Sequence, residues 1–300
     1  MNSVSQAIDW QNFLERTSFI ELDARERARS LLDPGSFREI VGPFDRVKSP
    51  WLPMQGIVAQ ADDGVVIARG TIDGVSAVVC AIESAYQGGS MGEVAGSKIA
   101  AALERAAEDC ERGCPTRAVI LFETGGVRLQ EANLGLEVIS EIHSAIVALR
   151  RHVPVIGVVA GMVGSFGGMS LAASLASSLI VTRQARIGMN GPEVIEQEAG
   201  IEEIDSSDKG LIWSLIGGEQ RYRSGLADRL VEDDAREIAA AVRAAFAKGV
   251  PARHRSEAAE TFLARLAAID PSRPLTGPDL QKLWGLWDAE PGTREEGKGS

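Results

Sequence analysis

The chain has 300 residues, of which 45% are hydrophobic and 24% charged, which is typical of a folded globular protein and excludes a disordered one. Its 31 Lys and Arg against 42 Asp and Glu give a formal net charge of −11, which argues against a surface that coats nucleic acid. No stretch reaches the ~20 apolar residues of a membrane span. The N-terminus lacks a secretory signal, and the three cysteines form no disulfide framework, so we expect a cytoplasmic protein with no membrane contact.

A polar N-terminal arm comes first, over residues 1–60. Its predicted helix, residues 24–32, ends at Asp33-Pro34-Gly35, because proline cannot continue a helix and glycine permits the turn. Proline-marked irregular chain follows. We expect this arm to lie across the core or against a partner.

Short strands and helices alternate over residues 61–232. Two β-branched runs flank Asp73-Gly74, a dipeptide typical of a hairpin turn. Further strands are predicted at residues 118–122, 155–160 and 179–182, and helices at 92–112, at 130–150 and from about 167. Apolar strands alternating with helices indicate a parallel sheet that is buried on both faces, which predicts an α/β fold for this core.

The C-terminal part is predicted to be helical. Helices are expected at residues 234–248 and 256–268, within an extension over residues 233–290. The polar tail, residues 291–300, is expected to be disordered. No repeat or linker divides the core.

Three glycine-rich stretches each follow a predicted strand and precede a predicted helix. They are Gly88-Gly89-Ser90-Met91-Gly92, Thr124-Gly125-Gly126-Val127-Arg128 and Gly164-Ser165-Phe166-Gly167-Gly168. A helix N-terminus leaves backbone N–H groups unpaired and partly positive, and glycine lets a ligand approach them. Two such turns at neighbouring strand ends therefore predict an oxyanion hole.

Two alternatives apply to these loops. One glycine loop alone is more often only a tight strand-to-helix turn, whereas three on successive units favour a binding role. A phosphate loop fits less well, because no Walker pattern is present and no GxGxxG lies between a strand and a helix.

These residues carry a family resemblance. The segments GGSMGEVAGSKI, ETGGVRLQEA and GMVGSFGGMSLA resemble the β-type half of biotin-dependent carboxyltransferases, a branch of the crotonase superfamily. The segments IELDARERARSLLDPGSFRE, LGLEVISEIHSAIVALR, GPEVIEQEAGIEEID and SLIGGEQRYRSGLAD more closely resemble β subunits of biotin-independent malonate decarboxylases. The chain lacks the four-cysteine zinc ribbon of the bacterial acetyl-CoA carboxylase β subunit, which disfavours that protein.

The resemblance implies a crotonase-like spiral of ββα units and a multi-subunit enzyme. In that family an acyl-carrier-protein subunit holds malonate as a thioester on a CoA-like (phosphoribosyl-dephospho-CoA) arm. A pair of β and γ subunits decarboxylates it to the acetyl-thioester, and an acyl-transferase subunit exchanges acetyl for malonyl. The present chain would be the β subunit, binding no metal or cofactor directly.

The resemblance also places the site. Loss of CO2 from a malonyl thioester leaves an enolate whose oxygen needs hydrogen-bond donors. We predict the catalytic donors to be N–H groups in two turns, Gly125-Gly126-Val127 and Phe166-Gly167-Gly168. The residues predicted to contact the substrate are Gly88, Gly89, Ser90, Arg128, Gly164 and Ser165.

Several side chains near these loops admit two interpretations. Arg128 could pair with a substrate carboxylate or phosphate, or serve at a helix start or interface. Glu123 could donate a proton, although a structural hydrogen-bonding role is commoner for an acid that ends a strand. The three histidines have no metal-binding spacing and are expected to be structural, so the proton donor to C2 stays unassigned.

Three other functions remain open at this stage. The first is the β subunit of a biotin-dependent acyl-CoA carboxyltransferase, which would use the same enolate-binding amides. The second is a scaffold subunit without catalysis. The third is a crotonase-type hydratase or isomerase, which the GGSMG and GGVRLQE segments fit less well.

Overall fold

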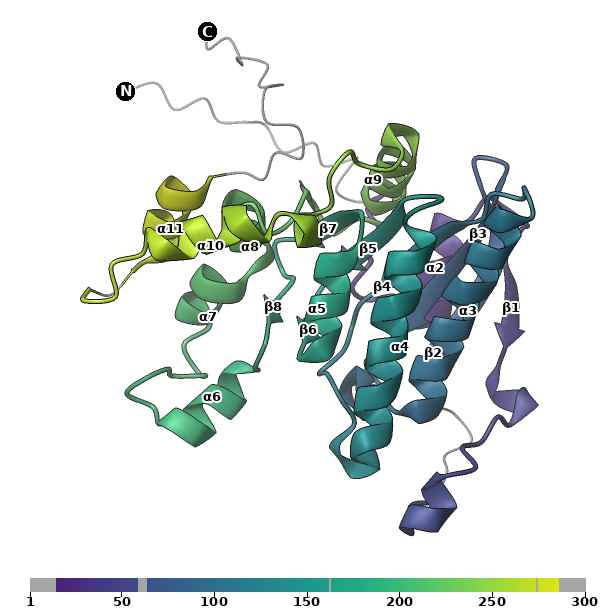
Figure 1. The fold of residues 1–300 in the computed structure, drawn as a ribbon, viewed down its shortest axis with the longest axis horizontal. Helices are drawn as coiled ribbons and strands as arrows, with labels where there is room; N and C mark the ends of the chain where they lie inside the picture. Colours follow the sequence, from purple (N-terminus) through teal and green to yellow (C-terminus); the bar gives the residue numbers. More distant parts are fainter. Residues whose placement is uncertain (1–14, 59–63, 162, 274, 286–300) are drawn as a thin grey trace, which may run out of the picture.

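The computed structural model describes residues 15–58, 64–161, 163–273 and 275–285 (Figure 1). Its centre is a seven-stranded sheet in the order β1-β2-β3-β4-β5-β7-β9. The first three strands pair antiparallel and the later neighbours pair parallel. The strands are β1 (Arg38–Val41), β2 (Val65–Ile72), β3 (Val75–Ile82), β4 (Arg117–Leu121), β5 (Val155–Val159), β7 (Ser178–Thr182) and β9 (Arg229–Val231). A separate parallel pair joins β6 (Ser165–Phe166) to β8 (Ile187–Gly188).

Helices cover both faces of the sheet. One face carries α3 (Glu93–Glu111), α4 (Asn133–Leu149) and α5 (Gly168–Leu175), and the other carries α2 (Ala24–Leu31) and α9 (Ala235–Lys248) (Figure 1). Beyond the β7–β9 side of the sheet lie α6 (Pro192–Ala199), α7 (Lys209–Ile216), α8 (Gly218–Arg223), α10 (Ala259–Ala267) and α11 (Gly277–Trp284). Among the described helices, none has the length and apolar character needed to cross a bilayer.

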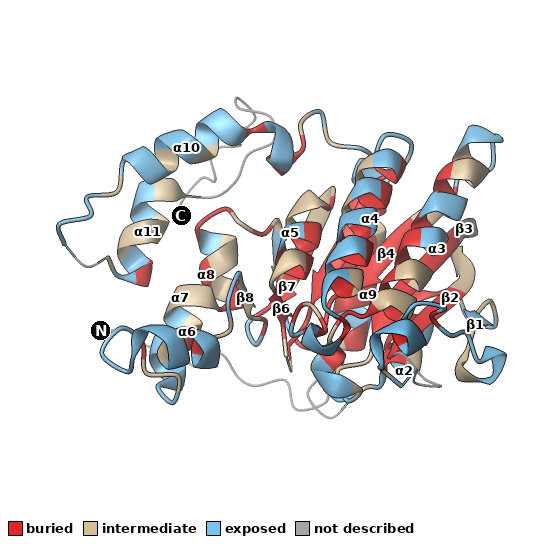
Figure 2. Cartoon of the chain, turned by 60° about the horizontal axis from the view of Figure 1, so that its bottom comes forward, coloured by how far each residue is buried: buried red, intermediate tan, exposed pale blue. Residues whose placement is uncertain are grey.

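The hydrophobic core lies on both sides of the sheet, and Figure 2 shows the central strands as buried. In β3 the side chains of Val78, Cys80 and Ile82 face the α3–α4–α5 layer, whereas Val79 and Ala81 face the α2–α9 layer. Alternate side chains point to opposite faces of a strand, so a strand buried on both faces must be apolar throughout. The predicted α/β architecture is therefore confirmed.

Local patterns located most of the central elements to within a few residues. The hairpin turns at Asp73 and Gly74, whose φ angles of +51° and +74° are those of a tight hairpin turn. The strand β1 differs from the sequence expectation, which is irregular chain over residues 38–41. Its half-exposed polar and apolar residues form a strand only because β2 offers an edge to pair with. The predicted disordered tail lies outside the described residues.

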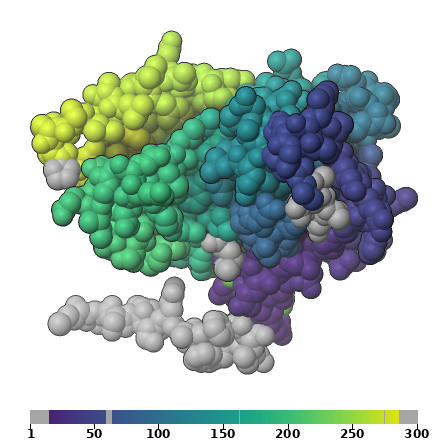
Figure 3. Space-filling model, turned by 90° about the horizontal axis from the view of Figure 1, so that it is seen from below, coloured from purple at the N-terminus to yellow at the C-terminus, as the bar shows by residue number. Residues whose placement is uncertain are grey.

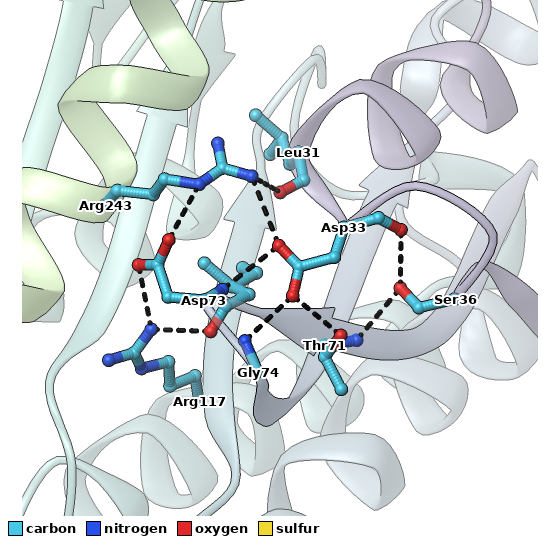
Figure 4. Close-up of polar contacts among 9 residues, drawn as sticks. Leu31, Asp33, Ser36, Thr71, Asp73, Gly74, Arg117 and Arg243 are labelled. Carbon is cyan, nitrogen blue, oxygen red and sulfur yellow. Dashed lines mark hydrogen bonds and ion pairs between the residues drawn. The ribbon is translucent and has the colours of Figure 1, made fainter.

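The end of the sheet that carries this hairpin is held by an ionic network (Figure 4). Asp33, which follows α2, accepts hydrogen bonds from the Gly74 N–H at 2.9 Å and the Thr71 hydroxyl at 2.7 Å. Arg243 of α9 lies 3.1 Å from Asp73 and 3.5 Å from Asp33. These contacts, with the Gly74 N–H foremost, lower the pKa of Asp33 from 3.8 to about 2. The network thus joins α2, the hairpin and α9.

Candidate active site

The first two glycine loops lie side by side where β3 and β4 end, at the opposite end of the sheet from the ionic network. The Gly125 N–H donates to the Gly88 carbonyl at 3.0 Å, and the Met91 N–H donates to the Gly126 carbonyl at 2.7 Å. Gly89 permits this approach, because a Cβ at that position would lie 1.9 Å from the carbonyl oxygen of Glu123. Only glycine is therefore compatible with this packing.

The third glycine loop packs against the second. The Thr124 N–H donates to the Gly164 carbonyl at 2.8 Å, and the Phe166 N–H donates to the Thr124 carbonyl at 3.2 Å. A Cβ built on Gly126 would lie 3.3 Å from the Phe166 oxygen and 3.7 Å from the Gly167 Cα. The two turns that were predicted to supply the oxyanion donors are therefore in direct contact.

The backbone N–H groups of these two turns differ in whether they are already used. Four of the six donate within the protein, namely those of Gly125, Gly126, Phe166 and Gly167, whose acceptors are Gly88 O, Thr124 Oγ1, Thr124 O and Met189 O. Within the described chain, the N–H groups of Val127 and Gly168 donate to no protein acceptor. Both residues are partly exposed, and Gly168 is the first residue of α5. These two groups are therefore available to a ligand oxygen.

Glu123 lies at the end of β4 and is 1% exposed. Its carboxylate accepts the Gly161 N–H at 2.6 Å and the Val163 N–H at 3.0 Å, both in the loop that precedes β6. This is the structural hydrogen-bonding role that the sequence favoured over proton donation. The buried carboxylate therefore holds the segment that leads into the third glycine loop.

Arg128 and Glu131 form a buried ion pair with 2.9 Å between Nη1 and Oε1. The Arg128 guanidinium also donates to the Ser90 carbonyl at 2.9 Å, and the Glu131 carboxylate accepts the Glu93 N–H at the start of α3 at 2.7 Å. A Cβ on Gly92 would lie 2.4 Å from the Glu131 Oε1, so glycine is needed beneath the pair. The pair thus ties the second glycine loop to the first.

A pocket of about 850 Å³ opens beside the Val127 turn. Figure 3 views this end of the molecule, where the dark-blue arm lies next to the teal segment that leads into α4. The lining residues are Ile57, Val58, Gln87, Ser90, Val127, Arg128, Leu129, Gln130 and Glu131. One of the two available N–H groups therefore belongs to a residue of a pocket wall, and two predicted substrate contacts, Ser90 and Arg128, lie in the same wall.

The other predicted substrate contacts are distributed unevenly. Gly88 is exposed on the first loop, whereas Gly164 and Ser165 are buried beneath the third. The Ser165 hydroxyl is fully buried and donates to no partner in the described chain. A Cβ on Gly164 would lie 2.3 Å from the Arg186 carbonyl oxygen, so this glycine is required by packing.

Cys80 takes no part in this arrangement, since it lies in the core within β3. Burial raises the pKa of the Cys80 thiol to about 12, so it stays protonated within the sheet. In the described residues no group of His, Cys, Asp and Glu is placed to hold a metal ion. His143 of α4 lies near the site, with its Nε2 2.8 Å from the Gly168 carbonyl oxygen.

Sequence reasoning gave no role to Thr124, Glu131 or His143 in this arrangement. Thr124 binds both turns through its carbonyl and hydroxyl, and His143 contacts the first residue of α5 from another helix. The threonine adjoined the glycine stretch and was a possible signal. The histidine lies 25 positions from Gly168 in the chain, and no spacing rule connects them.

The chain is similar in sequence and in structure to known carboxyltransferases and malonate decarboxylases. The carboxyl transferase domain family matches residues 21–274. A chain of a Pseudomonas malonate decarboxylase hetero-tetramer, solved in complex with malonate, is 60% identical with a TM-score of 0.87, covering 92% of this chain and 100% of that one. A chain of a Pseudomonas malonate decarboxylase hetero-dimer is 56% identical with a TM-score of 0.72, covering 85% of this chain and 98% of that one. A malonyl-S-ACP:biotin-protein carboxyltransferase of Malonomonas rubra is 39% identical over 75% of this chain and 74% of its own length.

Proposed function

The chain belongs to the carboxyl transferase domain family, and from that premise we propose that it is the β subunit of a malonate decarboxylase. One observation carries the chemistry. The Val127 and Gly168 N–H groups lie on two turns in direct contact, and they are the two donors of the predicted set that have no acceptor among the described residues. We assign them as the oxyanion donors, and the other four N–H groups of the turns as structural.

The reaction needs little more than these donors. The bond between C2 and the carboxylate carbon of a malonyl thioester breaks, CO2 leaves, and the electron pair passes through C2 to the thioester oxygen. Each N–H group aimed at that oxygen lowers the barrier by roughly 3 kcal/mol, because it stabilises charge that develops only in the transition state. Protonation of C2 then gives the acetyl thioester.

The pocket beside Val127 is the proposed entry for the substrate. Its wall joins the first glycine loop to the second, so a thioester that enters there would meet the Val127 N–H. The Arg128 guanidinium is already held by Glu131 and the Ser90 carbonyl, and Arg128 lines this pocket. We therefore propose that Arg128 shapes the pocket and that its charge is largely neutralised by Glu131.

The enzyme is proposed to work as a complex. The hetero-dimer and hetero-tetramer among the similar structures support a partner subunit, which we propose to be the γ subunit. The name of the Malonomonas relative supports a thioester carried on an acyl carrier protein. A CoA-like arm on that carrier, an acyl-transferase subunit and a cytoplasmic location complete the proposal.

A biotin-dependent carboxyltransferase is the second candidate, because the Malonomonas relative bears that activity in its name. The two functions share the enolate and differ in the fate of CO2. We expect the co-expressed β/γ pair to convert malonyl-thioester into equal amounts of CO2 and acetyl-thioester without biotin. Carboxylation of a biotin carrier without CO2 release would instead assign the second function.

A further inference from the structure

Glu123 holds the loop that leads to the second oxyanion donor. Its two carboxylate oxygens accept N–H groups from Gly161 at 2.6 Å and Val163 at 3.0 Å, with the Gly164 N–H at the limit of 3.5 Å. Within the described chain, the partners of this carboxylate are these backbone N–H groups. A buried carboxylate needs hydrogen-bond donors, because an unpaired charge is costly out of water. Here the backbone of one loop supplies them.

This loop runs directly into the third glycine turn. From Gly164 the chain passes through β6 and reaches Gly168 four residues later. The neighbouring residue Thr124 holds the same segment through its backbone, at Gly164 O and Phe166 N. Two consecutive residues just after β4, Glu123 and Thr124, therefore fix the segment, one by its side chain and one by its main chain.

We propose that Glu123 is a positioning residue, which fixes where the Gly168 N–H group lies relative to the Val127 N–H group. The inference rests on the proposed function, since it concerns the same two donors. Val127 follows Glu123 by four residues along the same loop, so the carboxylate couples the segment bearing one donor to the segment bearing the other. A small displacement of either donor weakens its hydrogen bond to the developing oxyanion.

The same contacts argue that Glu123 is not the proton donor to C2. The side chain is 1% exposed, and both of its oxygens act as acceptors for backbone groups. A proton on either oxygen would compete with those bonds.

The test is Glu123→Gln in the complete β/γ pair. The amide presents an NH2 group where the carboxylate had an acceptor, so one loop N–H must face a donor. We expect kcat for malonyl-thioester decarboxylation to fall about 10- to 100-fold, with KM changed less than about 3-fold. The shape of the pH profile of kcat should not change. Amide hydrogen exchange should become faster over residues 163–168, with little change elsewhere.

The matched control is Glu237→Gln, an exposed acid on α9 on the opposite face of the sheet, for which we expect wild-type rates. The inference is overturned if Glu123→Gln has wild-type kcat. It is also overturned if the loss of activity is fully explained by a smaller fraction of folded protein. Loss of one limb of the pH profile of kcat in the variant would overturn it too, because Glu123 would then be a proton donor. Absence of CO2 release by the wild-type pair would instead reject the proposed function.

Discussion

The two ends of the central sheet are built on opposite principles. At the hairpin end, charged side chains hold the backbone of the turn (Figure 4). They come from β4, from α9 and from Asp33, which follows α2, with Asp33, Asp73 and Arg243 at the centre. At the other end, glycines let three loops pack closely together, and the N–H groups of Val127 and Gly168 have no acceptor within the described residues.

The charged side chains of the two regions differ in burial. At the glycine end, Glu123 and the pair of Arg128 with Glu131 are buried and bind mostly backbone groups of the loops. They keep a polar, side-chain-poor region in one conformation. At the hairpin end the charges are partly exposed, so each contact contributes less. Changes at the two ends should therefore separate activity from stability.

The largest expected effect is that of Glu131→Ala. It leaves the buried Arg128 guanidinium without its carboxylate and the Glu93 N–H without its acceptor, which we expect to lower the free energy of unfolding by about 3–5 kcal/mol. Urea unfolding of the chain measures it. Arg243→Met at the hairpin end is the control, with an expected loss below about 1 kcal/mol because its ion pairs are partly exposed. Equal losses at both ends would contradict the contrast.

The next effect compares two glycines with positive φ. A Cβ on Gly126, at φ +107°, meets the Phe166 carbonyl oxygen at 3.3 Å, whereas one on Gly74, at φ +74°, meets nothing within 4 Å. We expect Gly126→Ala to lower kcat roughly 100-fold, because the turn that bears one donor must move. Gly74→Ala should cost about 1 kcal/mol of stability through backbone strain and leave kcat unchanged. Decarboxylation assays and thermal melting of both variants measure this, and a fully active Gly126→Ala enzyme would reject the donor assignment.

The smallest effect depends on pH. Because the folded-state pKa of Asp33 is lowered to about 2, its stabilisation is complete above the unfolded-state pKa of 3.8 and is lost as pH falls through 2. We expect Asp33→Asn to destabilise the chain by about 1 kcal/mol at pH 7, after allowance for solvent screening. The difference from wild type should shrink between pH 4 and pH 2 in urea unfolding at low salt. A difference that stays constant over this range would show that the charge of Asp33 has no such role.

Local patterns were enough to predict the hairpin and most helices and strands of the core. Asp73-Gly74 favours one type of turn, and runs of apolar residues must be buried on both faces. The strand β1 and the β6–β8 pair were not predictable in this way. Each is a short segment that becomes a strand only when another segment supplies an edge.

The candidate site divides in the same way. The sequence by itself determined that three glycine loops follow strands, and thereby which turns could bring bare backbone to a ligand. Only the tertiary structure decided which N–H groups are free, because the acceptors that occupy the others come from distant positions, such as Gly88 for Gly125 and Met189 for Gly167. It also decided that Glu123 serves a loop nearly forty residues away (Gly161 N–H, 38 positions on). A backbone donor has the same chemistry in every loop, so its availability depends on what the fold places opposite it.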